Sequence, residues 1–278
     1  MLNVDEIIAS ALIEDTGDGD HTSLSTIPED ATGKAKLLVK QAGILSGMEI
    51  AARVFSLVDP RISMHPLMKD GDVIQPGDIA FTVEGPSASI LKAERLVLNF
   101  MQRMSGIATT TSQYVRQLEG LNTRVLDTRK TTPLMRAIEK MAVRHGGGHN
   151  HRFGLYDMIM IKDNHVDFAG GIAKAIHAAK NYLEKNGKDL QIEIEVRNFD
   201  ELKQVLDTGG INRIMLDNFS PENLRKAVEM IAGKYETEAS GGITLETIRQ
   251  YAEAGVDFIS VGALTHQIKS LDLSLKAY

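Results

Sequence analysis

From about residue 122 onward, short apolar runs alternate with segments that show the 3.6-residue hydrophobic period of a helix. The apolar runs are rich in β-branched residues and have the length of buried strands. They are TRVLDT (123–128), MIMIK (158–162), IEIEV (192–196), RIMLDN (213–218), ETEAS (236–240) and FISVG (258–262). Prolines preceded by capping residues, at Thr132-Pro133 and Ser220-Pro221, predict two of the helix starts between them. The pattern predicts βα units in series with parallel strands.

Each predicted strand ends on a polar residue or a glycine. The ends are Thr128 followed by Arg129, Lys162, Glu195, Asp217, Ser240 followed by Gly241-Gly242, and Gly262. Active sites of βα barrels lie at the carboxyl ends of the strands, around a ring. Contributions from six consecutive strands favour such a ring over the single crevice of an open sheet. We therefore expect an α/β fold with a TIM-like barrel of about six strands, and a phosphate site at its last glycine turns.

The first 110 residues have a different pattern. AKLLVK, GILSG, RISMHPLMKDGDVIQPGDIAFTVEG and SASIL predict short strands that are separated by Gly, Pro and Asp turns, and EIAARVFSLV (49–58) predicts a helix among them. A long helical segment (91–120) follows, with a bend or break expected at Ser105-Gly106. We expect an N-terminal α+β domain with its linking helix (1–110) and a barrel domain (111–278), whose last residues return to pack on the first domain.

Composition and charge narrow the classes of function. The 278 residues are 43% hydrophobic and contain no cysteine, which excludes disulfides, thiolate metal sites, cysteine nucleophiles and iron–sulfur clusters. No apolar run is long enough to cross a bilayer, and the acidic first twenty residues lack the basic start of a signal peptide. With a net charge of −6, we expect a cytoplasmic protein that binds neither membrane nor nucleic acid.

Positive charge is concentrated in one part of this acidic chain. Between Arg129 and His165 there are seven Lys or Arg residues against three acids, a surplus of four, and four histidines lie in the same stretch. Lys140 and Arg144, one helical turn apart, are expected on a solvated helix face. The remaining surplus indicates a site for a small, strongly anionic ligand.

The histidines and glycines of HGGGHNHRFGLYDMIMIKDNH (145–165) raise two alternatives, a zinc site and a phosphate loop. Neither is favoured. There is no HExxH motif and no carboxylate at a fitting offset for zinc. The GGG triplet does not match GxxxxGK[ST] and follows a helix, so it is expected to be a place where backbones approach closely.

Charged residues near the predicted strand ends indicate the ligand more specifically than the histidines and glycines do. Arginine pairs bidentately with carboxylates, so Arg129 and the adjacent His151-Arg152 suit a ligand with more than one carboxylate, unless one arginine is structural. Lys162, at the end of an apolar strand, is a candidate Schiff-base nucleophile of an aldolase. Glu195 and Asp217 are candidates to bind metal or hydroxyls, or to form a structural salt bridge with Lys162.

Several stretches taken together resemble the quinolinate phosphoribosyltransferases, also called nicotinate-nucleotide pyrophosphorylases (carboxylating). They are GDGDHTS, ERLVLNFMQRMSGIAT, LDTRKTTP, GGGHNHRFGLYDMIMIKDNH, IEIEVRN, IMLDNFSPE, EASGGI and ISVGALTH, in the order of the family. The resemblance covers nearly the whole chain. It implies an open-faced N-terminal sandwich followed by an irregular α/β barrel, and the transfer of phosphoribose from phosphoribosyl pyrophosphate (PRPP) to quinolinate with decarboxylation.

By this resemblance, Arg129, His151 and Arg152 hold the two carboxylates of quinolinate. Arg103 matches an arginine that reaches the site from the neighbouring subunit, which implies a homodimer or a dimer-based assembly. One departure concerns the turn after RKTT. The family commonly has Pro-Gly there, whereas this chain has Pro133-Leu134, which leaves the backbone before Arg136 undetermined.

The resemblance also implies the catalytic and phosphate-binding groups. Lys130 and Lys162 line the charged pocket, and Glu195 and Asp217 lie near the ribose hydroxyls and the magnesium–pyrophosphate, with Mg²⁺ held through water or PRPP. The 5-phosphate is bound around Ser240, Gly242 and Gly262. No covalent nucleophile is required. Three alternatives remain: a Schiff-base aldolase, a relative linked to molybdate transport, and a non-catalytic binding protein for a dicarboxylate or nucleotide.

Overall fold

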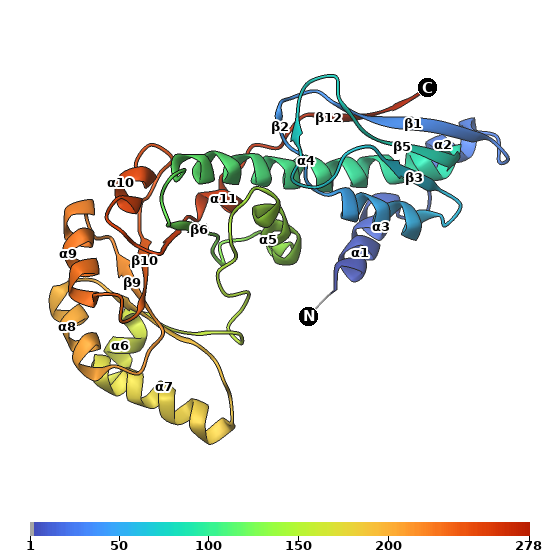
Figure 1. Ribbon diagram of the computed structural model, residues 1–278. Coiled ribbons are helices and arrows are strands. Elements are labelled where there is room, and N and C mark those ends of the chain that lie inside the picture. The colour runs from blue at the N-terminus through green and yellow to red at the C-terminus, as the bar shows by residue number, and fades with distance from the viewer. Residues whose placement is uncertain (1–2) are drawn as a thin grey trace. The chain divides into compact units, whose positions relative to one another are not determined.

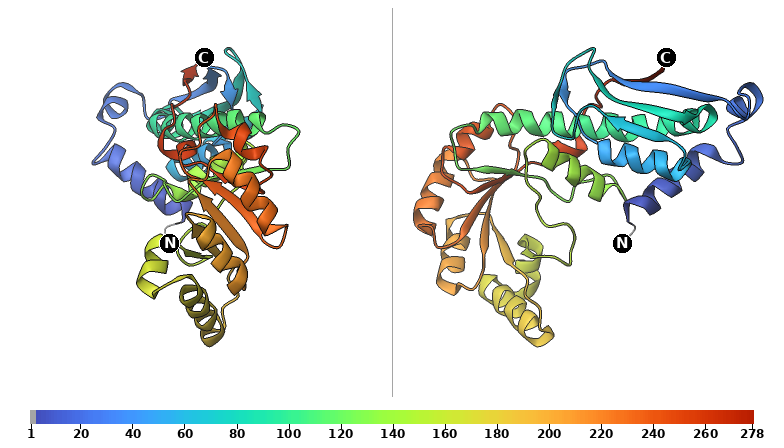
Figure 2. Two further views of the ribbon diagram at one scale, coloured as in Figure 1. Left: turned by 90° about the vertical axis from the view of Figure 1, so that its left-hand side faces the viewer. Right: turned by 45° about the vertical axis from the view of Figure 1, so that its right-hand side comes forward.

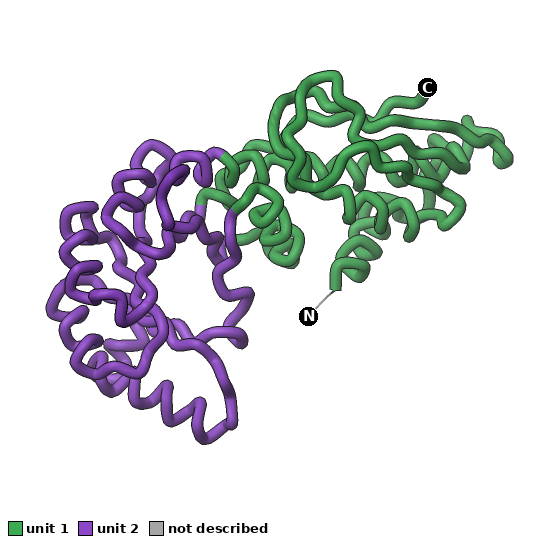
Figure 3. Tube along the Cα trace, in the orientation of Figure 1, with its two compact units in different colours: residues 1–112, 131–147, 263–278 green, residues 113–130, 148–262 purple. Residues whose placement is uncertain are grey.

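The computed structural model describes residues 3–278; Met1 and Leu2, at the start of the predicted first domain, lie outside them. The chain forms two compact units (Figure 3). Unit 1 comprises residues 1–112, 131–147 and 263–278, and unit 2 comprises 113–130 and 148–262. The units therefore do not follow a single cut after residue 110, because two segments beyond that point belong to unit 1.

Unit 1 is built on a four-stranded antiparallel sheet in the order β12-β1-β5-β3 (Figure 1). Its strands are β1 (Thr32–Val39), β3 (Ser63–Pro66), β5 (Ile79–Pro86) and β12 (Leu273–Ala277), with a separate pair β2 (Gly43–Ile44) and β4 (Val73–Ile74). The last strand aligns Ala277 with Ala35 of the first, so the end of the chain completes the N-terminal sheet.

The helices of unit 1 include the long α4, which lies along the sheet in Figures 1 and 2. They are α1 (Val4–Thr16), α2 (His21–Thr26), α3 (Met48–Val58), α4 (Ser87–Gln117), α5 (Arg136–His145) and α11 (Ala263–His266), with the last five residues of α4 assigned to unit 2. The helix predicted at 49–58 is confirmed as α3. Residues 87–91 were predicted as a strand, which is wrong, because they form the first turn of α4.

A bend or a break was predicted at Ser105-Gly106, and the break is wrong, since α4 is continuous through both residues. Gly106 is there for another reason. A Cβ atom at this position would collide with the backbone carbonyl of Lys269, so glycine allows the C-terminal segment to pass against the helix. The hydroxyl of Ser105 is buried and donates to the carbonyl of Ser46 at 3.1 Å. Both residues therefore serve packing within unit 1.

Unit 2 has a six-stranded parallel sheet in the order β6-β11-β10-β9-β8-β7. The strands are β6 (Arg124–Leu126), β7 (Ile159–Ile161), β8 (Ile192–Val196), β9 (Arg213–Asp217), β10 (Glu236–Ser240) and β11 (Phe258–Ser260), one within each predicted run. The first strand pairs with the last, with Arg124 opposite Phe258. An open doubly wound sheet would not join its first and last strands in this way, so the predicted barrel-like fold is confirmed.

Helices cover the outer side of the unit 2 strands, as Figure 2 shows. They are α6 (Asp163–Ala169), α7 (Ile172–Asn186), α8 (Phe199–Thr208), α9 (Pro221–Ile231) and α10 (Ile248–Ala252). Helix α9 begins as predicted, with Ser220 accepting from the Asn223 amide and Pro221 in the first turn. The start predicted at Thr132-Pro133 is wrong, because α5 begins only at Arg136. Every residue of β8 is buried, as expected for a strand covered on both faces.

Candidate active site

The carboxyl ends of the unit 2 strands bring several predicted residues to one edge of the sheet. Lys162 follows β7, Glu195 lies in β8, Asp217 ends β9, and Ser240 ends β10. Asp217 and Ser240 are register partners in neighbouring strands. Gly262 follows β11 at the same edge. These five positions come together as the alternating strand pattern predicts, although their roles toward a ligand remain predictions.

An ion pair joins two of these residues. Lys162 Nζ lies 3.1 Å from Glu195 Oε2, so the salt bridge considered as an alternative is present. Lys162 is half-exposed and Glu195 is largely buried. Burial raises the pKa of Asp217, while its hydrogen bond from Asn218 and the charges of Lys162 and Lys130 oppose this shift. Both lysines therefore act electrostatically on the carboxylate of Asp217.

Two arginines from different loops share one environment. Arg129 is half-buried in the loop after β6, and Arg152 is half-buried in the loop that precedes β7. Burial lowers the pKa of Arg152, and the charge of Arg129 lowers it further. One guanidinium nitrogen of Arg152, Nη1, donates to the Met158 carbonyl at 3.2 Å. Like charges destabilise each other in a partly buried site, so an anionic ligand between them would be stabilising.

His151 lies next to Arg152 but points into the protein. Its Nδ1 accepts a hydrogen bond from the backbone amide of Arg152 at 2.7 Å. Its Nε2 lies 2.9 Å from Glu193 Oε2 and 3.4 Å from Glu238 Oε2, and all three side chains are buried. Both ring nitrogens are thus engaged by protein groups. The sequence placed His151 at the site correctly, but this geometry favours a supporting position over direct contact with a carboxylate ligand.

The protonation of His151 is decided by its Nδ1 contact. Burial lowers the pKa of His151, but hydrogen bonds from its ring to Glu193 and Glu238 outweigh burial and raise the pKa to about 9. That shift favours an imidazolium, whereas the Arg152 amide at 2.7 Å requires an Nδ1 without a proton. Two facing N–H groups would repel at this distance. We therefore describe the ring as neutral, with its proton on Nε2.

A buried charged layer lies beneath the strand ends. Residues two apart on a strand face the same side, which places Glu193 beneath Glu195 and Glu238 beneath Ser240. Arg213 completes the layer. Its Nη1 lies 3.2 Å from Glu238 Oε2, and its guanidinium carbon lies 4.1 Å from the centroid of a phenylalanine ring in β11. Burial and the nearby charge of Glu238 raise the pKa of Glu193.

The loop between β6 and β7 is fixed by Asp127. This fully buried carboxylate accepts from the Asn150 side chain at 2.6 Å and from the His151 amide at 2.9 Å. Two hydrogen bonds to one carboxylate fix the backbone on which Arg152 follows. No pattern in the sequence singles out Asp127, because a polar residue is common at the end of a strand.

Arg103 belongs to unit 1, where it is held by α5. Its Nε and Nη2 donate to Glu139 Oε1 at 2.8 and 2.6 Å, and Nη2 also donates to Thr132 Oγ1 at 2.8 Å. Glu139 is 0% exposed, while the Arg103 side chain is 31% exposed. Lys140, expected on a solvated face, is only 2% exposed, so that expectation is wrong; Arg144 is exposed as expected. Arg136, left undetermined by the sequence, donates to Thr131 Oγ1 at 3.1 Å.

At position 134 this chain has leucine where the family commonly has glycine. Leu134 adopts φ +66°, the left-handed conformation that favours glycine, and its side chain is 71% exposed. The backbone conformation suited to glycine is therefore kept, at a cost of about 1 kcal/mol for a residue with a Cβ atom.

The glycine turn after β10 is conformationally demanding. Gly241 and Gly242 have φ values of +102° and +62°. A Cβ atom on Gly241 would collide with the Asn218 side chain, whereas the space beside Gly242 is open. The turn is also tied to β9, because the Asn218 amide donates to the Ser240 carbonyl at 2.8 Å. Such a turn suits close approach of a phosphate, which remains a prediction.

The four histidines of residues 145–165 do not form a metal site. His145 Nδ1 lies 2.8 Å from Ser46 Oγ, His149 Nδ1 lies 3.1 Å from the Gly148 carbonyl, and His165 Nδ1 accepts from the Lys162 amide at 3.0 Å. Within residues 3–278, the only group of three side chains arranged to hold a metal is His151, Glu193 and Glu238. At Gly146 a Cβ atom would collide with the backbone of α4, which confirms the expected close approach there.

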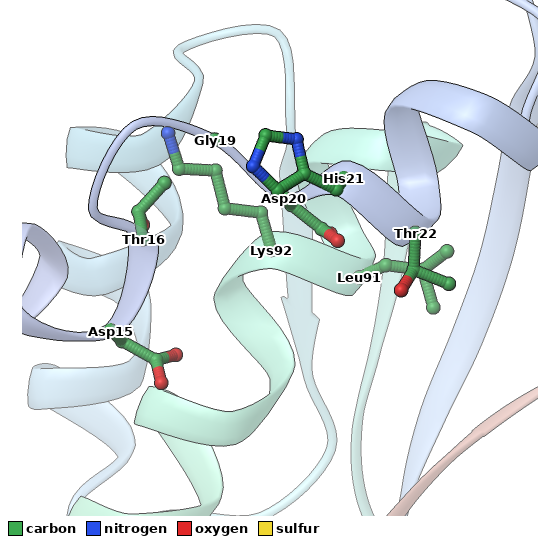
Figure 4. Close-up of a pocket in the computed structure, with 8 residues that line it drawn as sticks. All are labelled: Asp15, Thr16, Gly19, Asp20, His21, Thr22, Leu91 and Lys92. Atoms are coloured by element: carbon green, nitrogen blue, oxygen red, sulfur yellow. The ribbon is translucent and has the colours of Figure 1, made fainter.

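A separate surface pocket in unit 1 contains part of the GDGDHTS motif (Figure 4). It is lined by Asp15, Thr16, Gly19, Asp20, His21, Thr22, Leu91 and Lys92. Asp20 caps the short helix α2 by accepting from the Ser23 amide at 3.1 Å. None of the predicted site residues lines this pocket, and the motif has a local structural role.

Comparison with known proteins decides the family. Residues 107–276 match the family model of the quinolinate phosphoribosyl transferase C-terminal domain, and residues 20–105 match that of the N-terminal domain. The chain belongs to the quinolinate phosphoribosyltransferase family. Across residues 3–278, no helix is long and apolar enough to span a membrane.

Relatives match over nearly the full length of this chain. It is 45% identical to "Quinolinate phosphoribosyltransferase [decarboxylating] 1b" of Nicotiana tabacum, over 97% of this chain and 81% of that protein. It is equally 45% identical to "Nicotinate-nucleotide pyrophosphorylase [carboxylating], chloroplastic" of Arabidopsis thaliana, with the same coverage. The solved nicotinate-nucleotide pyrophosphorylase of Francisella tularensis superposes with a TM-score of 0.93 at 41% identity, covering 99% of this chain and 96% of that one.

Proposed function

We propose that this phosphoribosyltransferase joins quinolinate to PRPP and releases nicotinate mononucleotide, pyrophosphate and CO₂, a reaction of de novo NAD biosynthesis. Membership of the family over the full length supports the activity. The structural observation that carries it is the pair of half-buried arginines, Arg129 and Arg152, from the loops after β6 and before β7, with the charge of Arg129 acting on Arg152. Quinolinate has two adjacent carboxylates, and bidentate pairing with two arginines would neutralise both.

The reaction needs little covalent chemistry from the protein. The pyridine nitrogen attacks C1 of the ribose as the C1–oxygen bond breaks and pyrophosphate leaves. The quaternised ring then accepts the electron pair of the bond to the 2-carboxylate, CO₂ departs, and the ring carbon takes a proton from solvent. Arginine suits the carboxylates, because it stays charged and orients a carboxylate without protonating it.

The remaining strand-end residues suit PRPP. Lys130 and Lys162 would offset negative charge on the leaving pyrophosphate, and Glu195 and Asp217 would stabilise positive charge at C1. The 5-phosphate would bind the turn formed by Ser240, Gly242 and Gly262. The Lys162–Glu195 pair at 3.1 Å keeps the lysine beside a carboxylate, and the proposed reaction requires no covalent nucleophile. Borohydride trapping with a carbonyl substrate would support the aldolase alternative.

Magnesium is consistent with the residues present. Mg²⁺ is commonly bound through one or two carboxylates together with substrate phosphates and water. Glu195 and Asp217 supply two carboxylates at the carboxyl ends of adjacent strands. When bound, the ion would neutralise charge on the pyrophosphate. We propose these two residues as its protein partners, through water or PRPP.

A homodimer or dimer-based assembly is part of the proposal. Arg103 keeps a partly exposed guanidinium that is fixed by Glu139, which is suitable for presentation to a second subunit. The location of the enzyme in the cytoplasm remains a prediction, and the Arabidopsis relative carries the description "chloroplastic".

Turnover tests the proposed function directly. The purified chain, incubated with quinolinate, PRPP and Mg²⁺, should produce nicotinate mononucleotide, and omission of PRPP should abolish the product. Nicotinic acid in place of quinolinate is the matched control, because it lacks the 2-carboxylate. Product from nicotinic acid but none from quinolinate would refute the proposal, and binding without any product would favour the non-catalytic alternative.

A further inference from the structure

The buried layer beneath the strand ends has no part in the reaction as proposed above. Glu193 and Glu238 lie on β8 and β10, with β9 between them, and neither is exposed. Burying two carboxylates in one strand layer costs stability unless they are paired or hydrogen-bonded. A packed apolar layer would be the simpler solution for a barrel interior. Their presence therefore calls for a specific partner, and His151 is the side chain that both of them approach.

His151 connects this layer to the guanidinium pair. One nitrogen of its ring faces the two carboxylates, and the other accepts from the backbone amide of Arg152. Its own amide donates to the buried Asp127. Residue 151 is thus held at three points, and the next residue in the chain is Arg152. A small rotation of the imidazole would move the amide of Arg152 with it.

We propose that Glu193 and Glu238 are positioning residues, which fix the tautomer and ring orientation of His151 and thereby hold Arg152 for the carboxylates of the substrate. The inference rests on the proposed function for the identity of that substrate. In the neutral ring the proton lies on Nε2, which faces the two carboxylates at 2.9 and 3.4 Å, and this leaves Nδ1 free of a proton to accept from Arg152. A carboxylate–histidine pair fixes the ring in the same way in many metal sites.

Arg213 makes this arrangement tolerable for the fold. It pairs with Glu238 at 3.2 Å and with Glu236 at 2.9 Å, so part of the negative charge of the layer is offset. Glu236 provides the matched control. It lies on the same strand as Glu238 and pairs with the same arginine, but it is 47% exposed and is not one of the two carboxylates that approach His151.

Four variants of the full chain test the proposal: Glu193→Leu, Glu193→Gln, Glu238→Gln and the control Glu236→Gln. Leucine at position 193 removes the nearer of the two carboxylates that face His151, so we expect the KM for quinolinate to rise about tenfold, with the KM for PRPP within about twofold. Glutamine keeps an acceptor oxygen, so Glu193→Gln and Glu238→Gln should stay within about threefold. Glu236→Gln should leave both constants unchanged. Wild-type KM values for Glu193→Leu, or equal rises for both substrates, would overturn the proposal.

A second measurement does not depend on activity, and its wild-type result does not depend on the stability of the leucine variant. Nitrogen-15 NMR of histidine-labelled protein, assigned with His151→Asn, should report an Nε2–H tautomer for His151 in the wild type and in Glu193→Gln. Glu193→Leu should convert it to a mixture of tautomers. An Nδ1–H tautomer in the wild type would refute the positioning role. If the wild type forms no nicotinate mononucleotide, the proposed function fails, and the tautomer still decides the role of the two glutamates.

Discussion

Arg103 of unit 1 and the pair Arg129 and Arg152 of unit 2 lie in opposite electrostatic environments. Arg103 is bound by the fully buried Glu139 and by Thr132, so its charge is balanced within the unit. Burial lowers the pKa of Arg152, and the positive charge of Arg129 lowers it further. Arg103 thus has a charged partner within the unit, whereas we expect an anionic ligand to stabilise the pair Arg129 and Arg152.

The largest expected effect comes from removing one arginine of the pair Arg129 and Arg152. Arg129→Ala should raise the KM for quinolinate on the order of 100-fold, because a bidentate charged contact is lost, while the KM for PRPP changes far less. Steady-state kinetics with each substrate varied in turn measures this. Arg124→Ala, at an exposed arginine of β6, the strand that precedes Arg129, is the control and should have no effect. An equal loss for both substrates would show that Arg129 does not bind quinolinate.

A complementation experiment asks whether Arg103 acts in a neighbouring subunit. Arg103→Ala and Lys162→Ala should each be nearly inactive alone. In a dimer with shared sites, mixing and reassociating them restores one intact site in each hybrid, so activity should recover to about a quarter of wild type. The readout is nicotinate mononucleotide formation before and after subunit exchange. Without recovery, although hybrids are shown to form, Arg103 would be assigned to the site of its own chain.

A smaller effect is expected when the ion pair between Arg103 and Glu139 is removed. Glu139→Gln leaves the guanidinium without its charged partner, which should raise the KM for quinolinate about fivefold and lower the melting temperature by several degrees. Glu49→Gln is the control, because Glu49 contacts Arg53 at 2.7 Å in an exposed pair of the same unit. Exposed pairs contribute little, so neither quantity should change. If Glu139→Gln and Glu49→Gln behaved identically, the ion pair of Arg103 with the buried Glu139 would contribute no more than an exposed pair.

The smallest effect concerns the turn before α5. Leu134→Gly relieves a left-handed conformation and should change the free energy of unfolding by less than about 1 kcal/mol, in the stabilising direction, with KM values within about twofold. Ala232→Gly is the matched control, since Ala232 has φ +52° in unit 2. Denaturant unfolding of both variants provides the comparison. A clear destabilisation by Leu134→Gly alone would mean that the exposed leucine side chain makes a stabilising contact, for example with a second subunit.

Much of unit 2 could be predicted because strand chemistry repeats along the chain. Apolar runs ending in Lys162, Glu195 and Asp217 indicate both the strands and the edge where these side chains meet. The N-terminal half was harder. Residues 87–91 have the composition of a strand but continue into α4, because tertiary packing of a long amphipathic helix outweighs the local preference of five residues.

The supporting residues of the site were missed for a related reason. Glu193 and Glu238 are visible in IEIEV and ETEAS as charges at alternate positions of buried strands, which is the one signal that could have indicated them. Glu139 gave no such signal, since a glutamate on a helix is ordinarily exposed. Their partners, His151 and Arg103, are distant in sequence, and no periodic pattern specifies contacts of that kind.

The sequence by itself determined the βα order, the polar strand ends, the local excess of positive charge and the family. These follow from periodicity and from short motifs, both of which are local properties of the chain. The tertiary structure decided that the first strand of unit 2 joins the last, that residues 131–147 and 263–278 belong to unit 1, and that His151 faces inward. Those features depend on which buried groups satisfy one another across long separations, and only the folded chain brings them together.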